Sequence, residues 1–232
     1  ALPLVGCGDD IPDRGEFIEQ MSLTARSGFV KSADSAGIDK ERAGEIFDEW
    51  VGCIYDKVSS DQARLAGYCS AKGRLLASFV LWPQADDELL LACSADLLPP
   101  TLKRLSMFVL RAKCKLRDAS AELKAVGVVG PSAERVGQGH TPGQAWADGQ
   151  GGQWLRLPDV LGVVRCLWVG PEQQAHAVLQ ASPAQPEGAW AWLDVMSGVA
   201  RIETAGVDQF VPQMVNFELV GGVNFAKGCY PG

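Results

Sequence analysis

The sequence lacks the features that mark several large classes of protein. No apolar run approaches the roughly 20 residues that cross a bilayer, so we expect no membrane span. The first seven residues have neither the basic end nor the long apolar core of a signal peptide. Lys and Arg number 21 against 28 Asp and Glu, and the net charge of −7 argues against a general nucleic-acid-binding protein. We therefore expect a cytoplasmic protein that contacts neither nucleic acid nor membrane directly.

Metal-binding patterns are scarce too. The two histidines, His140 and His176, stand far apart, and the seven cysteines include no Cys-x-x-Cys pair. A zinc site or a four-cysteine cluster site needs grouped ligands, so we expect no self-contained metal site. Seven is an odd number for a disulfide scaffold, and 232 residues make a long chain for one. Reduced thiols in a cytosol fit these cysteines better.

Common catalytic and nucleotide-binding motifs are missing as well. No Gly-x-Gly-x-x-Gly follows a predicted strand and no Gly-x-x-x-x-Gly-Lys-Ser/Thr occurs, which argues against dinucleotide and P-loop nucleotide chemistry. The Gly-x-Ser-x-Gly elbow of hydrolases is absent too. A cysteine protease that pairs Cys229 with a histidine stays open, because such partners meet only in space.

The order of predicted elements indicates an α+β fold with antiparallel sheets. Alternating and β-rich runs predict strands at residues 64–70, 74–82, 88–94, 113–117, 122–130, 154–157 and 162–169. Helical spacing predicts helices at 38–51, from 99 to about 112 and at 171–179. The glycine-rich residues 131–152 predict a long loop. We divide the chain into an unassigned segment, 1–37, and two α+β halves, 38–130 and 131–232, with interleaving of the halves left open.

The end of the sequence has a pattern that favours a reactive thiol. Residues 223–228 alternate like a strand that runs into a Gly/Pro turn. Continued strand geometry puts the side chains of Lys227 and Cys229 on one face. There the ammonium group favours the thiolate, the form that attacks electrophiles or ligates metals. Cys229, activated by Lys227, is therefore the candidate catalytic pair. The alternative is a buried, inert cysteine at a strand end.

Residues 189–195 bring two tryptophans and a carboxylate together. Strand alternation predicts that Trp190, Trp192 and Asp194 share one face. Two indoles and a carboxylate suit a flat heterocycle with amide-like edges, such as a pterin. The alternative is that one or both tryptophans belong to the core.

A further polar pair lies in residues 210–216. Gln213 and Asn216 each carry donors and acceptors that a buried ring system could use. Their alternative role is to satisfy the backbone of a loop. We predict both as ligand-binding residues, together with Trp190, Trp192 and Asp194.

Three motifs in this order resemble one protein family. Residues 227–232, Lys-Gly-Cys-Tyr-Pro-Gly, resemble the signature of the YgfZ family of folate-binding proteins, which are relatives of the glycine-cleavage T-protein. Residues 69–74 resemble a second hallmark, Cys-x-x-Lys-Gly-Arg, and residues 210–216 a third, Phe-x-Pro-Gln-x-x-Asn. The family motif continues with Gln-Glu after the last glycine. We therefore expect a chain that is truncated before the family's C-terminal β-barrel domain.

The resemblance implies a T-protein-like fold that binds tetrahydrofolate, with Trp190 at the position of a folate-site tryptophan. It also implies an accessory function, in which the protein supports assembly or repair of iron–sulfur clusters in client enzymes, including tRNA-modifying ones. Such a protein is not a classical turnover enzyme. The alternative is a folate-dependent aminomethyl or one-carbon transferase in which Asp194 assists proton movement. A third hypothesis is an interaction module without a ligand.

The same resemblance suggests a use for the one concentration of basic residues, at 103–117. An electrostatic landing site for an anionic tail, such as the glutamates of folate, is the specific interpretation. The general one is a solvated basic face.

Overall fold

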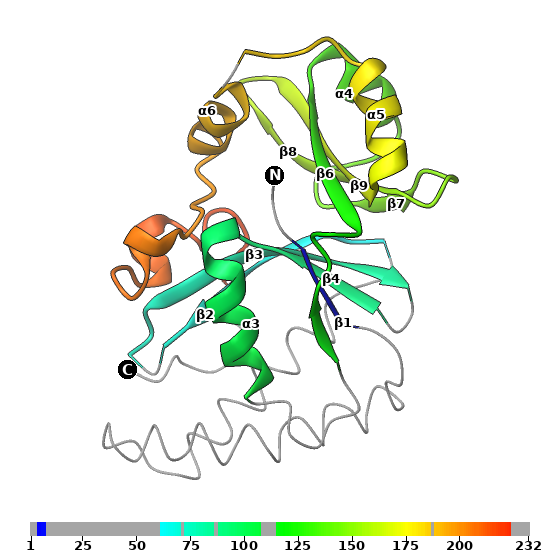
Figure 1. The fold of residues 1–232 in the computed structure, drawn as a ribbon. Coiled ribbons are helices and arrows are strands. Elements are labelled where there is room, and N and C mark those ends of the chain that lie inside the picture. The colour runs from blue at the N-terminus through cyan, green and yellow to red at the C-terminus, as the bar shows by residue number, and fades with distance from the viewer. Residues whose placement is uncertain are drawn as a thin grey trace.

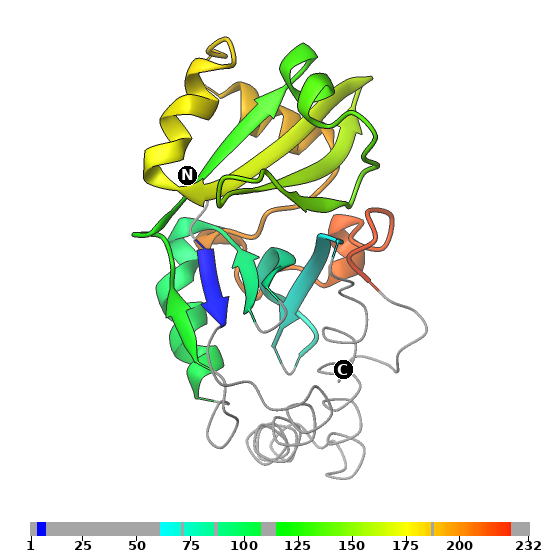
Figure 2. The same ribbon diagram turned by 90° about the vertical axis from the view of Figure 1, so that its right-hand side faces the viewer.

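Two antiparallel sheets, one above the other, organise the molecule (Figures 1 and 2). The computed structural model describes residues 4–7, 61–70, 72–85, 88–107, 115–186 and 188–223. The predicted helix at 38–51 and the Lys227–Cys229 pair lie outside these residues. No helix within the described ranges is long and apolar enough to cross a membrane.

The first sheet has five strands in the order β2-β3-β4-β1-β5. They are β1 (Leu4–Cys7), β2 (Arg64–Cys69), β3 (Leu75–Ala85), β4 (Glu88–Ala92) and β5 (Leu116–Asp118). The predicted hairpin at 64–82 is confirmed, because β2 and β3 pair antiparallel around a tight turn. Gly73 in that turn has a φ of 71°, the left-handed region that glycine adopts at little cost.

The second sheet has four strands in the order β6-β9-β8-β7. They are β6 (Leu123–Val129), β7 (Ala145–Ala147), β8 (Gln153–Val160) and β9 (Val163–Pro171). Helices α4 (Pro131–Val136) and α5 (Glu172–Gln180) cover its outer face (Figure 1). The strands expected at 122–130, 154–157 and 162–169 and the helix expected at 171–179 are thereby confirmed. The expected loop at 131–152 is wrong in part, since it contains α4 and β7.

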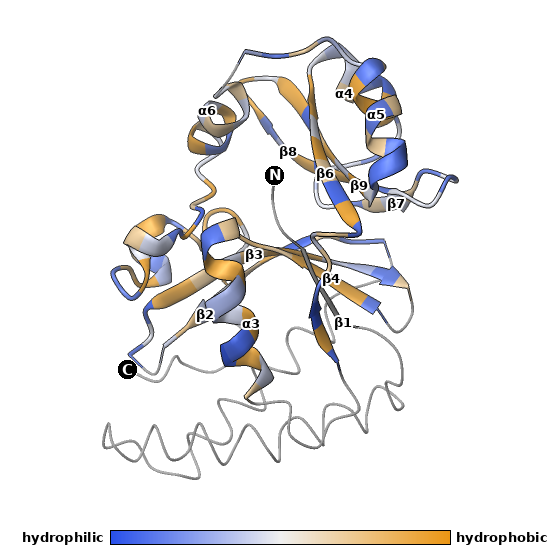
Figure 3. Ribbon diagram, in the orientation of Figure 1, coloured by the Kyte–Doolittle hydropathy of each residue, from blue (hydrophilic) through white to orange (hydrophobic). Residues whose placement is uncertain are grey.

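Helix α3 (Leu98–Ser106) follows the short 3₁₀ helix η1 (Ala95–Leu97) and packs on the first sheet. Buried residues of η1, α3 and β3 form the core there, and Figure 3 shows hydrophobic residues along β3 and hydrophilic ones on α5. A second core lies between the sheets. It joins Trp82 and Leu90 of the first sheet to Leu155 and Leu167 of the second.

The two sheets are also joined by a polar contact. The Nε1 atom of Trp82 donates a hydrogen bond to Oε1 of Gln153 at 2.9 Å, and Nε2 of Gln153 donates to the carbonyl oxygen of Pro83 at 3.0 Å. Trp82 is fully buried, so its N–H needs this partner. The contact fixes β8 against β3 and sets the separation of the sheets beside it.

Residues 189–195 form a helix, α6 (Ala189–Met196), and our expectation of a strand there is wrong. The spacing Trp190, Leu193, Asp194 is that of one helix face, and Ala, Leu and Met favour helix. Gly188, with a φ of 82°, precedes the helix, and Gly198, with a φ of 70°, follows it. Helical periodicity therefore overrides the apparent alternation of the tryptophans.

After α6 the chain returns to the first sheet. It passes the 3₁₀ helices η2 (Thr204–Gly206) and η3 (Pro212–Val215). Its Ile202 is buried in the core beneath β3, and backbone hydrogen bonds join Leu75 to Asp208 and Phe210 at 2.9 and 2.8 Å. This part of the chain, residues 197–223, is called the returning segment, and it helps to build the first sheet.

Candidate ligand-binding site

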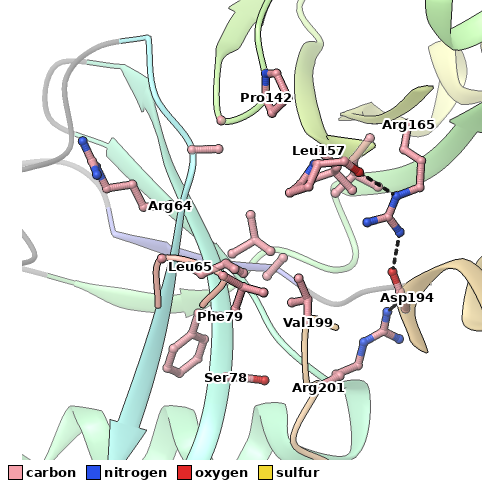
Figure 4. A pocket seen from close by; sticks show the side chains of 18 of the residues that line it. Arg64, Leu65, Ser78, Phe79, Pro142, Leu157, Arg165, Asp194, Val199 and Arg201 are labelled. Carbon is pink, nitrogen blue, oxygen red and sulfur yellow. Dashed lines mark hydrogen bonds and ion pairs between the residues drawn. The ribbon is translucent and has the colours of Figure 1, made fainter. Parts of the chain in front are cut away.

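A cavity of about 300 Å³ lies between the two sheets. Strands of both sheets, the loop before β7, helix α6 and the returning segment all contribute to its wall (Figure 4). Apolar side chains on that wall are Leu65, Phe79, Val80, Leu157, Leu167 and Val199. The volume lies at the lower end of the usual range for small-molecule pockets, about 300–1,000 Å³.

Trp190 of helix α6 lies on the wall of the cavity and packs closely against the second sheet. A Cβ atom placed on Gly127 of β6 would lie within 2.8 Å of three atoms of the indole ring. Only glycine leaves room for the ring at this point. A second neighbour is Arg165 of β9, whose Cζ atom lies 5.6 Å from the ring centroid, within the range of a cation–π interaction. Trp190 is therefore both a packing residue and a part of the wall.

Asp194 lies one helical turn after Trp190 and binds two arginines. Nη1 of Arg165 donates to Oδ1 of Asp194 at 3.0 Å, and Nη2 of Arg201 donates to Oδ2 (Figure 4). The Asp194 side chain is 21% exposed and that of Arg165 only 2%. The carboxylate thus ties α6 to β9 on one side and to the returning segment on the other.

The buried guanidinium of Arg165 is stabilised by that carboxylate. Burial lowers the pKa of Arg165 from its ordinary value, and the charge of Asp194 and its hydrogen bond oppose this. Arginine stays charged in proteins even so. A positive charge is therefore held at the wall of a mostly apolar cavity.

Arg156 also contributes to the wall, but its side chain is engaged elsewhere. It is 7% exposed and forms an ion pair with Asp159 at 2.5 Å. Its Nη1 atom donates to the carbonyl oxygens of Leu157 and Arg165 at 2.7 and 3.3 Å. Arg156 therefore stabilises the β8–β9 hairpin.

Two buried thiols in the described part of the chain are inert. Cys93 contributes to the wall and is 1% exposed. Burial, with a smaller contribution from Asp96 and Asp118, raises the pKa of Cys93 to about 11. Burial likewise raises the pKa of Cys166 to about 11. Both are therefore protonated at neutral pH and are poor nucleophiles.

Comparison with known proteins places these features in a family context. No protein-family model matches the chain. It is 31% identical over 186 residues to the tRNA-modifying protein YgfZ of Edwardsiella ictaluri, and 26% identical over 192 residues to that of Vibrio vulnificus. The chain is a homologue of the YgfZ proteins. The alignments cover 75% and 78% of this chain, which spans only 55% and 56% of the length of these two relatives.

The fold of this YgfZ homologue has a solved counterpart. The glycine cleavage system aminomethyltransferase T from Bartonella henselae matches it with a TM-score of 0.50 and 14% sequence identity. The match covers 78% of this chain and 42% of that protein. The expected T-protein-like α+β fold is therefore confirmed.

The structure brings some of the predicted site residues together and separates others. Trp190 and Asp194 both lie on the wall of the cavity, whereas Trp192 points outward from α6 and is 53% exposed. Gln213 is exposed on η3. Asn216 ends η3 in the left-handed region, with a φ of 55°, a conformation that Asn tolerates. Neither Gln213 nor Asn216 is among the described residues of the wall.

One family-like motif lies against the residues that lead into another. The turn at 69–74 contacts the chain just before the motif at 210–216, because Ser70 Oγ donates to Oδ1 of Asp208 at 2.7 Å. Nη1 of Arg74 donates to the carbonyl oxygen of Gln209 at 2.5 Å. In the described residues these motifs therefore hold the returning segment against the β2–β3 hairpin.

Arg165 and Arg201 were missed in the sequence as site residues. One signal was available for Arg165, since it interrupts the apolar run of β9. An arginine in a buried strand requires an anionic or carbonyl partner. No group of three or more His, Cys, Asp or Glu side chains in the described part of the chain could hold a metal ion.

Proposed function

We propose that the chain binds tetrahydrofolate in the cavity between its sheets. In this role it supports, in the cytoplasm, the assembly or repair of iron–sulfur clusters in client enzymes, including tRNA-modifying ones. The observation that carries the proposal is the composition of the cavity wall. The indole of Trp190, the carboxylate of Asp194 and the two arginines paired with it lie on the wall of a mostly apolar space, in a chain related to YgfZ proteins.

The wall suits the parts of a folate. A pteridine is flat and apolar on its faces, and the indole of Trp190 and the apolar side chains provide surfaces for it. Its edges and its carboxylates are hydrogen-bonding groups, and Arg165, Asp194 and Arg201 provide charged partners. Folate bound here supplies a one-carbon carrier, while the residues of the wall bind and orient it.

The chemical group in this proposal is the thiol of Cys229, with Lys227 favouring its thiolate form. Both residues lie outside the described part of the chain. The described part passes the cavity at Val220 and Gly221, shortly before this pair in the sequence. We propose that Cys229 acts as a nucleophile or as one ligand of a cluster shared with a client protein.

A fluorescence titration with tetrahydrofolate tests the binding site. The variants Trp190→Phe and Trp192→Phe form a matched pair, because both residues lie on α6 but only Trp190 lines the cavity. We expect quenching in the native protein and in Trp192→Phe, and a clear loss of quenching in Trp190→Phe. The absence of quenching in the native protein, or equal quenching in both variants, contradicts the site.

The accessory role is tested in cells that lack the gene. We expect the native gene to restore a tRNA modification made by an iron–sulfur enzyme, measured by mass spectrometry of the nucleosides. Cys229→Ala should fail to restore it, while Cys166→Ala serves as a thiol-deletion control, because burial keeps that cysteine protonated. Restoration by Cys229→Ala contradicts a role for the thiol.

A further inference from the structure

We propose that a carboxylate of the ligand binds between Arg165 and Arg201, so that the cavity selects an acid and not only a flat ring. This inference rests on the proposed folate binding and assigns one end of the ligand within the cavity. It also assigns two binding residues, one on β9 and one on the returning segment.

The first step is the hydrogen bonding of Arg165. Its Nε atom donates to the carbonyl oxygen of Pro158 at 3.2 Å, and its Nη1 atom donates to Asp194 at 3.0 Å. Figure 4 shows the remaining nitrogen, Nη2, turned away from both partners and toward the cavity. Within the described residues, Nη2 has no hydrogen-bond acceptor. A side chain that is only 2% exposed thus directs an unused donor into the cavity.

The second step is the position of Arg201. Its Nη2 atom donates to the other oxygen of Asp194, and the next residue is fixed because Ile202 N donates to Ser78 Oγ at 2.9 Å. Asp194 therefore holds both guanidinium groups at the same side of the cavity (Figure 4). Arg201 is 34% exposed, so it lies where a charged group of a ligand could enter from solvent.

The third step is the balance of charge. Arg165 and Arg201 share a single anionic partner, Asp194. Asp194 is also the only acidic residue among the described residues of the wall. An added carboxylate would neutralise the remaining positive charge, and guanidinium groups recognise carboxylates in a directed way. In a chain whose net charge is −7, this local excess of positive charge favours an acidic ligand.

The basic run at 103–117 is less suited to that task. Arg117 forms ion pairs with Glu88 at 3.3 Å and with Glu122 at 2.8 Å. Arg104 donates to the hydroxyl of Tyr68 at 3.2 Å. In the described residues of this run, both arginines contact neighbouring side chains. We therefore assign the binding of the ligand's carboxylate to the cavity and not to this surface.

Calorimetric titration with three ligands tests the inference. Tetrahydrofolate carries the ring and the carboxylates, tetrahydrobiopterin carries only the ring, and N-(4-aminobenzoyl)glutamate carries only the acidic part. Arg201→Gln is the main variant because its side chain is partly exposed and its loss should leave the fold intact. Arg135→Gln, an exposed arginine on α4, is the control for loss of one positive charge.

We expect Arg201→Gln to weaken tetrahydrofolate and N-(4-aminobenzoyl)glutamate by roughly tenfold or more, the usual effect of losing a charged hydrogen bond. Tetrahydrobiopterin should bind equally to the native protein and the variant, and Arg135→Gln should change nothing. Equal weakening of all three ligands, or of none, overturns the carboxylate site while folate binding stands. If the native protein does not bind tetrahydrofolate, the proposed function fails as well.

Discussion

The contact between Gly127 and Trp190 yields a prediction that joins packing to the cavity. We expect Gly127→Ala to destabilise the protein, because the added methyl group would lie within 2.8 Å of three indole atoms. Carbon atoms in favourable contact lie about 3.5–4.0 Å apart, so the ring must move. Added atoms in a well-packed site cost about 1–3 kcal/mol. For a protein of this size each kcal/mol lowers Tm by about 2–4 °C.

A double-mutant cycle provides the assay. Thermal unfolding is measured for Gly127→Ala, Trp190→Leu and the double variant, and we expect the double variant to be more stable than the sum of the two effects implies. Trp192→Leu replaces the exposed tryptophan of the same helix and should combine additively with Gly127→Ala. Additive effects in both cycles, or a Gly127→Ala protein as stable as the native one, would refute the close contact.

Four further outcomes follow from the same geometry. Gln153→Leu should cost about 1–3 kcal/mol in urea unfolding, because the buried Trp82 N–H loses its acceptor; an unchanged midpoint would contradict this. Alkylation with iodoacetamide at pH 8, read by mass spectrometry, should leave Cys93 and Cys166 unmodified in the folded protein, since burial raises the pKa of each to about 11; rapid labelling of either would contradict their burial. Burial raises the pKa of Asp148, but hydrogen bonds from Trp168 Nε1 and from the backbone of Gln150 and Gly152 together outweigh burial, so the pKa lies below its ordinary value. The stabilisation by Asp148 should therefore be full at neutral pH and be lost as the pH falls below the ordinary value near 3.9. We accordingly expect the Tm difference between the native protein and Asp148→Ala to shrink in acid. Finally, we expect no one-carbon transfer from a methylamine donor to tetrahydrofolate; transfer that is lost in Asp194→Asn and kept in Cys229→Ala would favour the transferase alternative.

The parts of the fold that were predicted from sequence depend on local signals. The β2–β3 hairpin follows from alternation around Gly73, and helix α5 follows from its start beside Pro171. Helix α6 was misread because two tryptophans and an aspartate at alternate positions imitate a strand. The same residues also satisfy helical spacing, and the glycines at 188 and 198 mark the ends of the helix.

The candidate site was predicted only in part, for a physical reason. Trp190 and Asp194 were found because unusual residues lie close together in the sequence. Arg165 binds Asp194 across 29 positions of the chain, and no local pattern records a contact that the packing of a strand on a helix creates. Trp192 differs from Trp190 only in the direction that a helix gives it, which a strand prediction could not provide.

A crystal structure of the protein with tetrahydrofolate tests the central claim most directly. The account predicts electron density for the ligand between the two sheets, with the pteridine against Trp190 and a carboxylate at Arg165 and Arg201. Ligand density on an outer surface, or a ligand whose ring lies at the arginines and whose carboxylates lie elsewhere, would contradict it.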